Sequence, residues 1–178
     1  MLACVGLRAL LSWTYPLKYE DHILASAREF EVDPFLIAAV IKVESNYRQG
    51  AISPKGAVGL MQLLPDTARQ VAGLLRMQDY TPEALSDPKV NIRLGSAYMR
   101  LLLTEFGDDR IMALAAYNGG LGRAREWWRQ GILKPGGGLS QIPFAETRSF
   151  VERVLKTTGT YQALYGDRLK MPDRTSGG

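Results

Sequence analysis

The feature that most restricts the fold is an almost uninterrupted apolar run, FLIAAVIKV, at residues 35–43. Asp33 and Pro34 precede it, and an acidic N-cap followed by proline at the first helical position is a typical helix start. Because the run is apolar on nearly every face, this helix is expected to be buried rather than to lie on the surface.

The rest of the chain shows the same helical signals and no sustained period-two alternation. Capping residues, Asp-Pro or Thr-Pro pairs and terminal glycines mark the ends of the segments. Helices are expected at residues 19–31, 34–47, 65–73, 81–86, 87–107, 108–118, 121–131 and 144–164, with 87–107 the longest. The predicted fold class is therefore all-α, with at most a short strand or turn around residues 59–63.

Length and composition indicate one domain. The chain has 178 residues, of which 46% are hydrophobic and 22% charged, as in an ordinary soluble globular protein. Residues 15–165 are expected to form the domain and 166–178 a flexible tail. The apolar residues 1–14 are too short to span a bilayer. They are interpreted either as the remnant of an export or anchor segment or as a first helix packing on the core.

Several chemistries are excluded by what the sequence lacks. It holds a single cysteine, Cys4, and a single histidine, His22. No internal disulfide, zinc set or Ser-His-Asp arrangement can be built from them. No metal and no cofactor are expected. The net charge of +4 comes from scattered residues and only weakly favours an acidic partner.

The apolar run ends at an acidic residue, Glu44, which shares a helix face with Val40 and Ile41. Burial on that face would raise the pKa of the carboxyl, so that it holds a proton near neutral pH. Such an acid is what general-acid cleavage of a glycosidic bond requires. The alternative is an ordinary ion pair with Arg48, one helical turn further on.

Two later segments place hydrogen-bonding groups among small residues. The loop after Glu44 contains Ser53 and Gln62, and Gln62 can donate and accept hydrogen bonds, as sugar hydroxyls require. Tyr117 and Asn118 stand where a helix breaks at two glycines. The alternatives are a simple connecting loop and a core tyrosine.

In this order, the segments resemble the catalytic domain of the soluble lytic transglycosylases, lysozyme-like enzymes that cut peptidoglycan. The resemblance covers roughly residues 15–165. It rests on Glu44-Ser45, Gly59-Leu60-Met61-Gln62, NIRLGSAYM at 91–99, Ala116-Tyr117-Asn118-Gly119-Gly120 and IPFAETRSFV at 142–151.

The resemblance implies a role for individual residues. Glu44 matches the family's catalytic acid. Substrate-binding positions are matched by Ser53, Gly59, Met61, Gln62, Ala116, Tyr117, Asn118 and Glu146. Asn118 and Ser45 are equally open to structural roles. Phe150 stands where the family usually has tyrosine, so no polar contact is expected from it.

The same resemblance implies peptidoglycan strands as the partner and an extracytoplasmic location in the cell envelope. It also implies a single acid that acts twice and closes a 1,6-anhydromuramic ring. A monomer is expected, with possible membrane association through the N-terminus. The alternatives are a hydrolytic muramidase and a non-catalytic wall-binding module. A nucleic-acid binder using Arg123, Arg125 and Arg129 beside Trp127 and Trp128 is the least favoured.

Overall fold

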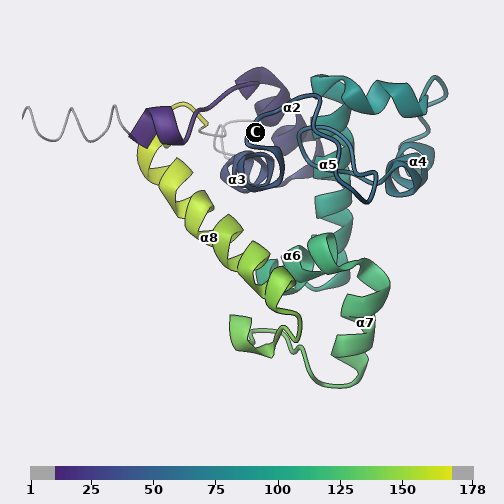
Figure 1. The fold of residues 1–178 in the computed structure, drawn as a ribbon, viewed down its shortest axis with the longest axis vertical. Helices are drawn as coiled ribbons and strands as arrows, with labels where there is room; N and C mark the ends of the chain where they lie inside the picture. The colour runs from purple at the N-terminus through teal and green to yellow at the C-terminus, as the bar shows by residue number, and fades with distance from the viewer. Residues whose placement is uncertain (1–10, 170–178) are drawn as a thin grey trace, which may run out of the picture.

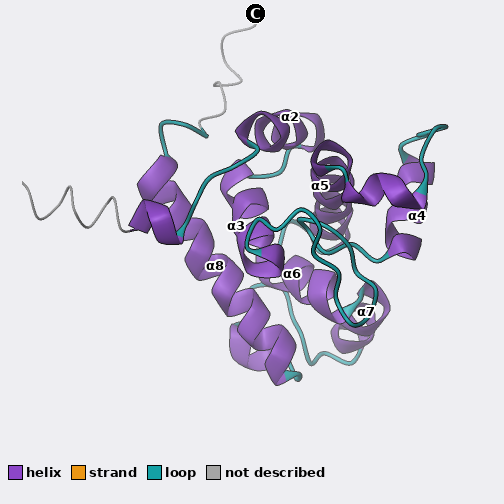
Figure 2. Cartoon of the chain, turned by 45° about the horizontal axis from the view of Figure 1, so that its top comes forward, coloured by secondary structure: helices purple, strands orange, loops and turns teal. Residues whose placement is uncertain are grey.

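The computed structural model describes residues 11–169, and every regular element in that range is a helix (Figures 1 and 2). The all-α prediction is confirmed. The elements are α2 (Glu20–Phe30), α3 (Pro34–Ser45), α4 (Pro65–Leu74), the 3-10 turn η1 (Pro82–Ser86), α5 (Pro88–Glu105), α6 (Arg110–Gly119), α7 (Leu121–Arg129), the 3-10 turn η2 (Leu139–Gln141) and α8 (Ala145–Tyr165).

The observed helices differ from the predicted ones in details. The last helix, α8, is the longest with 21 residues, whereas α5, which was expected to be longest, has 18. Residues 82–86 form a 3-10 turn rather than an α-helix. The buried helix ends at Ser45, because Asn46 and Tyr47 both adopt left-handed backbone conformations. The chain therefore turns sharply immediately after Glu44.

Helix α3 is the central element, as its apolar run predicted. The Asp33 side chain accepts a hydrogen bond from the Phe35 amide at 2.9 Å and caps the helix. Every residue from Leu36 to Ile41 is at most 1% exposed. Helix α8 crosses the molecule beside α3, and α5 passes along α2 (Figure 1). The C-terminal end of α3, with Glu44, points toward the space framed by α6, α8 and the following loop.

The loop of residues 46–64 contains the only strand-like pairing in the described range. It consists of two isolated antiparallel bridges, Ile52 with Val58 and Val58 with Leu63. The expected short strand or turn around residues 59–63 is thus reduced to single bridges. They fold the loop back on itself beside the end of α3.

Both terminal segments contact the helices where they are described. The hydroxyls of Tyr161 and Tyr165 each donate to a backbone carbonyl of residues 15–16, at 2.8 Å. Arg168 forms an ion pair with Glu20. Residues 166–169 are therefore packed on the domain, while residues 1–10 and 170–178, which hold most of the predicted leader and tail, lie outside the described residues. No helix in the described range is both long enough and apolar enough to span a membrane.

Candidate active site

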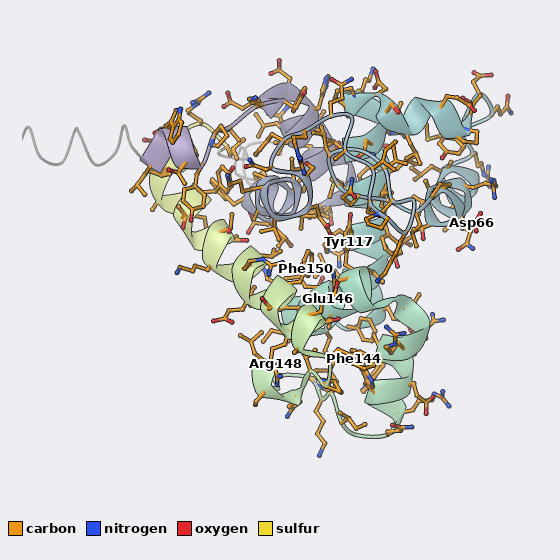
Figure 3. All side chains as sticks on the ribbon, in the orientation of Figure 1. Asp66, Tyr117, Phe144, Glu146, Arg148 and Phe150 are labelled. Atoms are coloured by element: carbon orange, nitrogen blue, oxygen red, sulfur yellow. The ribbon has the colours of Figure 1, made fainter. Side chains whose placement is uncertain are left out.

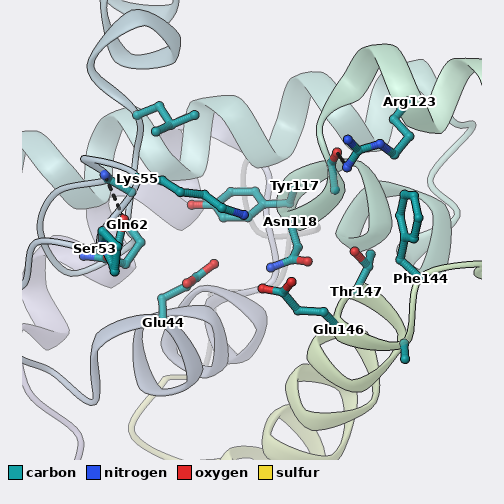
Figure 4. Close-up of a pocket in the computed structure, with 15 residues that line it drawn as sticks. Glu44, Ser53, Lys55, Gln62, Tyr117, Asn118, Arg123, Phe144, Glu146 and Thr147 are labelled. Carbon is teal, nitrogen blue, oxygen red and sulfur yellow. Dashed lines mark hydrogen bonds between the residues drawn. The ribbon is translucent and has the colours of Figure 1, made fainter.

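Two adjoining cavities form a groove, and Glu44 lies where they meet. The larger cavity, of about 670 Å³, extends from the 53–64 loop past α6 to the start of α8 (Figure 4). The smaller cavity, of about 590 Å³, is lined mainly by Arg48 and residues 50–54. Four residues line both cavities: Glu44, Ser53, Pro54 and Gln62. The groove thus offers space on both sides of one carboxyl group.

Glu44 is partly buried in the last turn of α3, and its carboxyl points into the groove (Figure 4). Burial raises the pKa of this carboxyl from its usual 4.5 to about 7, and the charge of Arg153 on α8 partly opposes the shift. The negative end of the α3 dipole further disfavours the charged form. The alternative ion pair is not formed: Arg48 instead donates from its Nε to the Ser45 carbonyl at 3.1 Å. Glu44 can therefore hold a proton at neutral pH.

Tyr117 forms the wall of the groove opposite Glu44 (Figure 4). Its hydroxyl donates to the Met61 carbonyl at 2.7 Å, and its ring stacks on Phe150 with an interplanar angle of 4°. Burial and the Glu44 charge raise the pKa of the Tyr117 hydroxyl well above its usual range, so it stays protonated. The hydrogen bond directs the hydroxyl proton to Met61, so Tyr117 does not offer that proton to a ligand.

The NIRLGSAYM segment explains how the loop is held in place. Asn91 and Gly95 are four residues apart and therefore share one face of α5. The Asn91 side chain accepts from the Met61 amide at 2.8 Å and donates to the Val58 and Leu85 carbonyls at 3.0 and 2.9 Å. At Gly95, an added Cβ would lie 2.4 Å from the Met61 sulfur. One face of α5 thus fixes the loop that carries Gln62.

Ser53 and Gln62, two polar residues of this loop, line the groove. Some of their hydrogen-bonding groups are already used by contacts within the loop. The Gln62 amide nitrogen donates to the carbonyls of Ala51 and Gly59 at 3.0 and 2.8 Å. Its side-chain oxygen is then the group left for a ligand, so Gln62 acts as an acceptor rather than as both donor and acceptor. The Ser53 hydroxyl accepts from the Ala57 amide at 3.0 Å and keeps its own proton to donate.

Three predicted binding residues do not line the groove with their side chains. Gly59 is buried with φ +82°, and a Cβ there would lie 2.3 Å from the Asn91 amide nitrogen. Met61 and Ala116 are 0% exposed. The structure places these residues behind the wall, where they support the groove. Their side chains therefore do not line the groove, and glycan binding by these three residues stays a prediction that their backbone groups would have to fulfil.

Asn118 and Glu146 do line the larger cavity, and both are exposed. Figure 4 shows the Asn118 amide and the Glu146 carboxyl reaching toward the space in front of Glu44. The fold thereby brings Glu146, which is about a hundred residues after Glu44 in sequence, to the same cavity as Glu44. Asp66 is close to the loop in sequence, but its side chain lies away from the groove and pairs with Arg69 at 2.8 Å (Figure 3).

The lining residues for which no glycan-binding role was expected include Lys55, Arg123, Phe144 and Thr147. Phe144 and Thr147 belong to the IPFAETRSFV segment. They lie two residues before and one residue after Glu146, and such separations do not predict a shared helix face. Arg123 was considered only for nucleic acid. Trp127, which was expected to stack on bases under that alternative, is 6% exposed and packs in the core.

The described residues contain no group of three or more histidine, cysteine or acidic side chains arranged to hold a metal ion. The chemistry available in the groove is therefore that of carboxyl, hydroxyl, amide and cationic side chains. Such a groove, with one protonated carboxyl at its floor and polar groups on its walls, is suited to acid-assisted cleavage of a polar chain. These features define the class as a helical domain with a carboxyl group of raised pKa in a polar groove.

Comparison with known proteins identifies the family. The model of the transglycosylase SLT domain matches residues 21–132. The soluble lytic murein transglycosylase of Escherichia coli K12 is 34% identical over 167 residues, which cover 92% of this chain and 26% of that protein. This chain belongs to the transglycosylase SLT domain family. It spans about a quarter of the length of the soluble lytic murein transglycosylases that it matches.

Solved structures agree with this assignment. The crystal structure of the 70 kDa soluble lytic transglycosylase from Escherichia coli has a TM-score of 0.81 and 34% identity, covering 89% of this chain and 26% of that one. An inactive glutamate-to-glutamine mutant of the lytic transglycosylase Slt from Pseudomonas aeruginosa has a TM-score of 0.77 and 33% identity, covering 86% and 25%. The expected lysozyme-like fold is confirmed.

Proposed function

We propose that the domain is a lytic transglycosylase that cuts the β-1,4 bond between N-acetylmuramic acid and N-acetylglucosamine in peptidoglycan. The observation that carries the proposal is Glu44, whose pKa of about 7 and position between two cavities suit a general acid. The names of the relatives and the inactive glutamate-to-glutamine mutant of one of them support it.

In the first half of the reaction, Glu44 donates its proton to the oxygen that links the two sugars. The bond between that oxygen and C1 of muramic acid breaks, and its electron pair leaves with the oxygen as a hydroxyl of N-acetylglucosamine. The carbonyl oxygen of the muramic 2-acetamido group stabilises the positive charge at C1. This neighbouring group does the work that a second carboxylate does in an ordinary glycosidase.

In the second half, the C6 hydroxyl of the same muramic acid attacks C1 and gives its proton to the Glu44 carboxylate. A 1,6-anhydro ring closes, Glu44 returns to its acid form, and no water is consumed. A group with a pKa of about 7 can give and take a proton with similar ease near neutral pH. No metal or cofactor takes part.

Other groove residues are proposed to hold the sugars in position. The Gln62 and Tyr117 oxygens accept hydrogen bonds from sugar hydroxyls, and the Ser53 hydroxyl donates one. Asn118 and Glu146 contact the glycan from the α6 and α8 sides. Gly59, Met61 and Ala116 act indirectly by fixing the wall.

A hydrolytic muramidase is the second candidate, and one observation favours it: Glu146 lines the same cavity as Glu44. A second carboxylate could activate water in place of the C6 hydroxyl. Mass spectrometry of peptidoglycan digested by the purified protein separates the two. Anhydro ends are expected, and reducing ends, which contain an added water, would show hydrolysis instead.

A non-catalytic wall-binding module would release no soluble fragments, so turbidity of a cell-wall suspension would stay constant. We infer that the protein works in the cell envelope outside the cytoplasmic membrane, where its proposed substrate lies. A monomeric state is retained as a proposal. Attachment to the membrane through the N-terminus is retained as a proposal.

A further inference from the structure

The larger cavity ends in a fixed cation. Arg123, in the first turn of α7, lies with Phe144 at the end of the cavity farther from Glu44 (Figure 4). Its Nη1 donates to the Gly119 carbonyl at 3.0 Å, and its guanidinium carbon lies 4.9 Å from the centre of the Phe144 ring. Contacts on two sides hold the guanidinium in one orientation, and its remaining N–H groups are available to a ligand.

The other arginines of α7 serve a different purpose. Arg125 forms a two-pronged ion pair with Glu105 at 2.7 and 3.0 Å, and Arg129 pairs with Glu126. Neither lines the groove. Within residues 11–169, Arg123 has no carboxylate partner, so the one α7 arginine that faces the groove keeps an uncompensated charge.

The charges around Arg123 favour an anion at this end of the groove. The two carboxyls of the cavity, Glu44 and Glu146, lie toward its middle, with the Glu146 carboxyl directed to Glu44 (Figure 4). Phe144 and Thr147 stand on the Arg123 side. Lys55 is a second exposed cation of the same cavity, but it lies on the loop wall, away from Arg123 (Figure 4). A planar guanidinium held by an aromatic ring is well suited to bind a carboxylate through two parallel hydrogen bonds.

Peptidoglycan carries carboxylates at defined places. Its sugar rings bear neutral hydroxyl and acetamido groups, whereas the peptide attached to the lactyl group of muramic acid bears carboxyl groups. The lactyl carboxyl itself is a neutral amide where a peptide is attached and is a carboxylate only where the peptide has been removed. We propose that Arg123 is a specificity-determining residue that binds a carboxylate of this muramyl substituent. The inference rests on the proposed function and deepens it. It predicts that the domain prefers strands with free carboxylates to strands from which that charge has been removed.

The test uses three preparations of the same soluble strands: untreated, with all carboxyls converted to methylamides, and with the peptides removed enzymatically. Wild type should lose about tenfold in kcat/KM on the methylamide strands, mainly through KM, as expected for one charge-assisted contact at a solvent-accessible site. Arg123→Met should cleave untreated and methylamide strands with nearly equal kcat/KM. Arg123→Lys keeps the positive charge but cannot form two parallel hydrogen bonds to a carboxylate. Its preference for untreated over methylamide strands should therefore lie between those of wild type and Arg123→Met.

Arg125→Met is the matched control, because it removes the same charge from the same helix outside the groove; it should discriminate as wild type does. Equal discrimination by Arg123→Met and wild type would overturn the proposal. The peptide-free strands carry a newly freed lactyl carboxylate in place of the peptide carboxylates. Dependence on Arg123 that persists there shows that Arg123 also accepts the lactyl carboxylate, and dependence that disappears there restricts its ligand to the peptide carboxylates.

A binding measurement tests the role of Arg123 independently of whether the protein catalyses the proposed reaction. Calorimetry of a soluble muropeptide with Glu44→Gln, compared with the double variant that also carries Arg123→Met, measures carboxylate recognition without cleavage. About tenfold weaker binding by the double variant supports the role of Arg123 even if wild type fails to cleave any strand. Equal affinities would refute that role whatever the outcome of the cleavage assay.

Discussion

Replacing Glu44 with glutamine should stabilise the fold above neutral pH while removing cleavage. Glutamine keeps the size of the side chain but does not ionise, so the cost of burying a charge disappears. A pKa raised from 4.5 to about 7 corresponds to roughly 3 kcal/mol, at about 1.4 kcal/mol per unit. Between these values the native state binds more protons than the unfolded state, so wild-type stability falls as pH rises. The full free-energy cost of burying the charged carboxyl is present above the native-state pKa of about 7. It vanishes below the unfolded-state pKa of 4.5.

Urea unfolding followed by circular dichroism, from about pH 4 to about pH 8.5, measures this difference directly. The free energy of unfolding of Glu44→Gln minus that of wild type should grow by roughly 3 kcal/mol across the range. Leu64→Ala, a change at the groove that adds or removes no titrating group, should differ from wild type by a constant amount. A Glu44→Gln difference that does not change with pH would refute the burial argument.

Three further predictions concern the surroundings of Glu44. Arg153→Met removes a charge that lowers the Glu44 pKa, so the alkaline limb of the pH–activity profile should move up by roughly half a pH unit, and a downward shift would contradict the assignment. Gly59→Ala should destabilise the protein by about 2 kcal/mol or more in thermal unfolding, because its Cβ would lie 2.3 Å from the Asn91 amide nitrogen at a φ of +82°. Glu146→Gln should retain measurable release of anhydro products, and complete loss would favour the two-carboxylate hydrolase.

The helix that carries Glu44 could be predicted from the sequence, because helix caps and apolar runs are local sequence features. Asp33-Pro34 and the run that follows predicted a buried helix over residues 34–47, and the observed helix begins at Pro34 and ends two residues early, at Ser45. The burial that raises the Glu44 pKa could be anticipated from the apolar face it shares. Where prediction failed at the end of this helix, the reason was the left-handed backbone of Asn46 and Tyr47, which sequence periodicity does not signal.

The walls of the groove depend on contacts between segments that are distant in sequence, and these contacts could not be predicted from the sequence. Nothing in the loop sequence shows that Asn91 accepts from the Met61 amide across 30 residues, or that Tyr117 donates to the Met61 carbonyl across 56. These contacts decide that Met61 lies behind the wall. Arg123 was likewise interpretable only once its ring contact with Phe144 was known. Side-chain direction separates a groove residue from a core residue, and it is set by tertiary packing.

The central claim is that Glu44 carries a proton near neutral pH within the groove. NMR titration of protein labelled with ¹³C at glutamate carboxyls measures it directly, with the Glu44 signal assigned by its absence in Glu44→Gln. The account predicts a midpoint near 7 that coincides with the alkaline limb of the cleavage activity. A Glu44 midpoint near 4.5, with activity undiminished above it, would contradict the account.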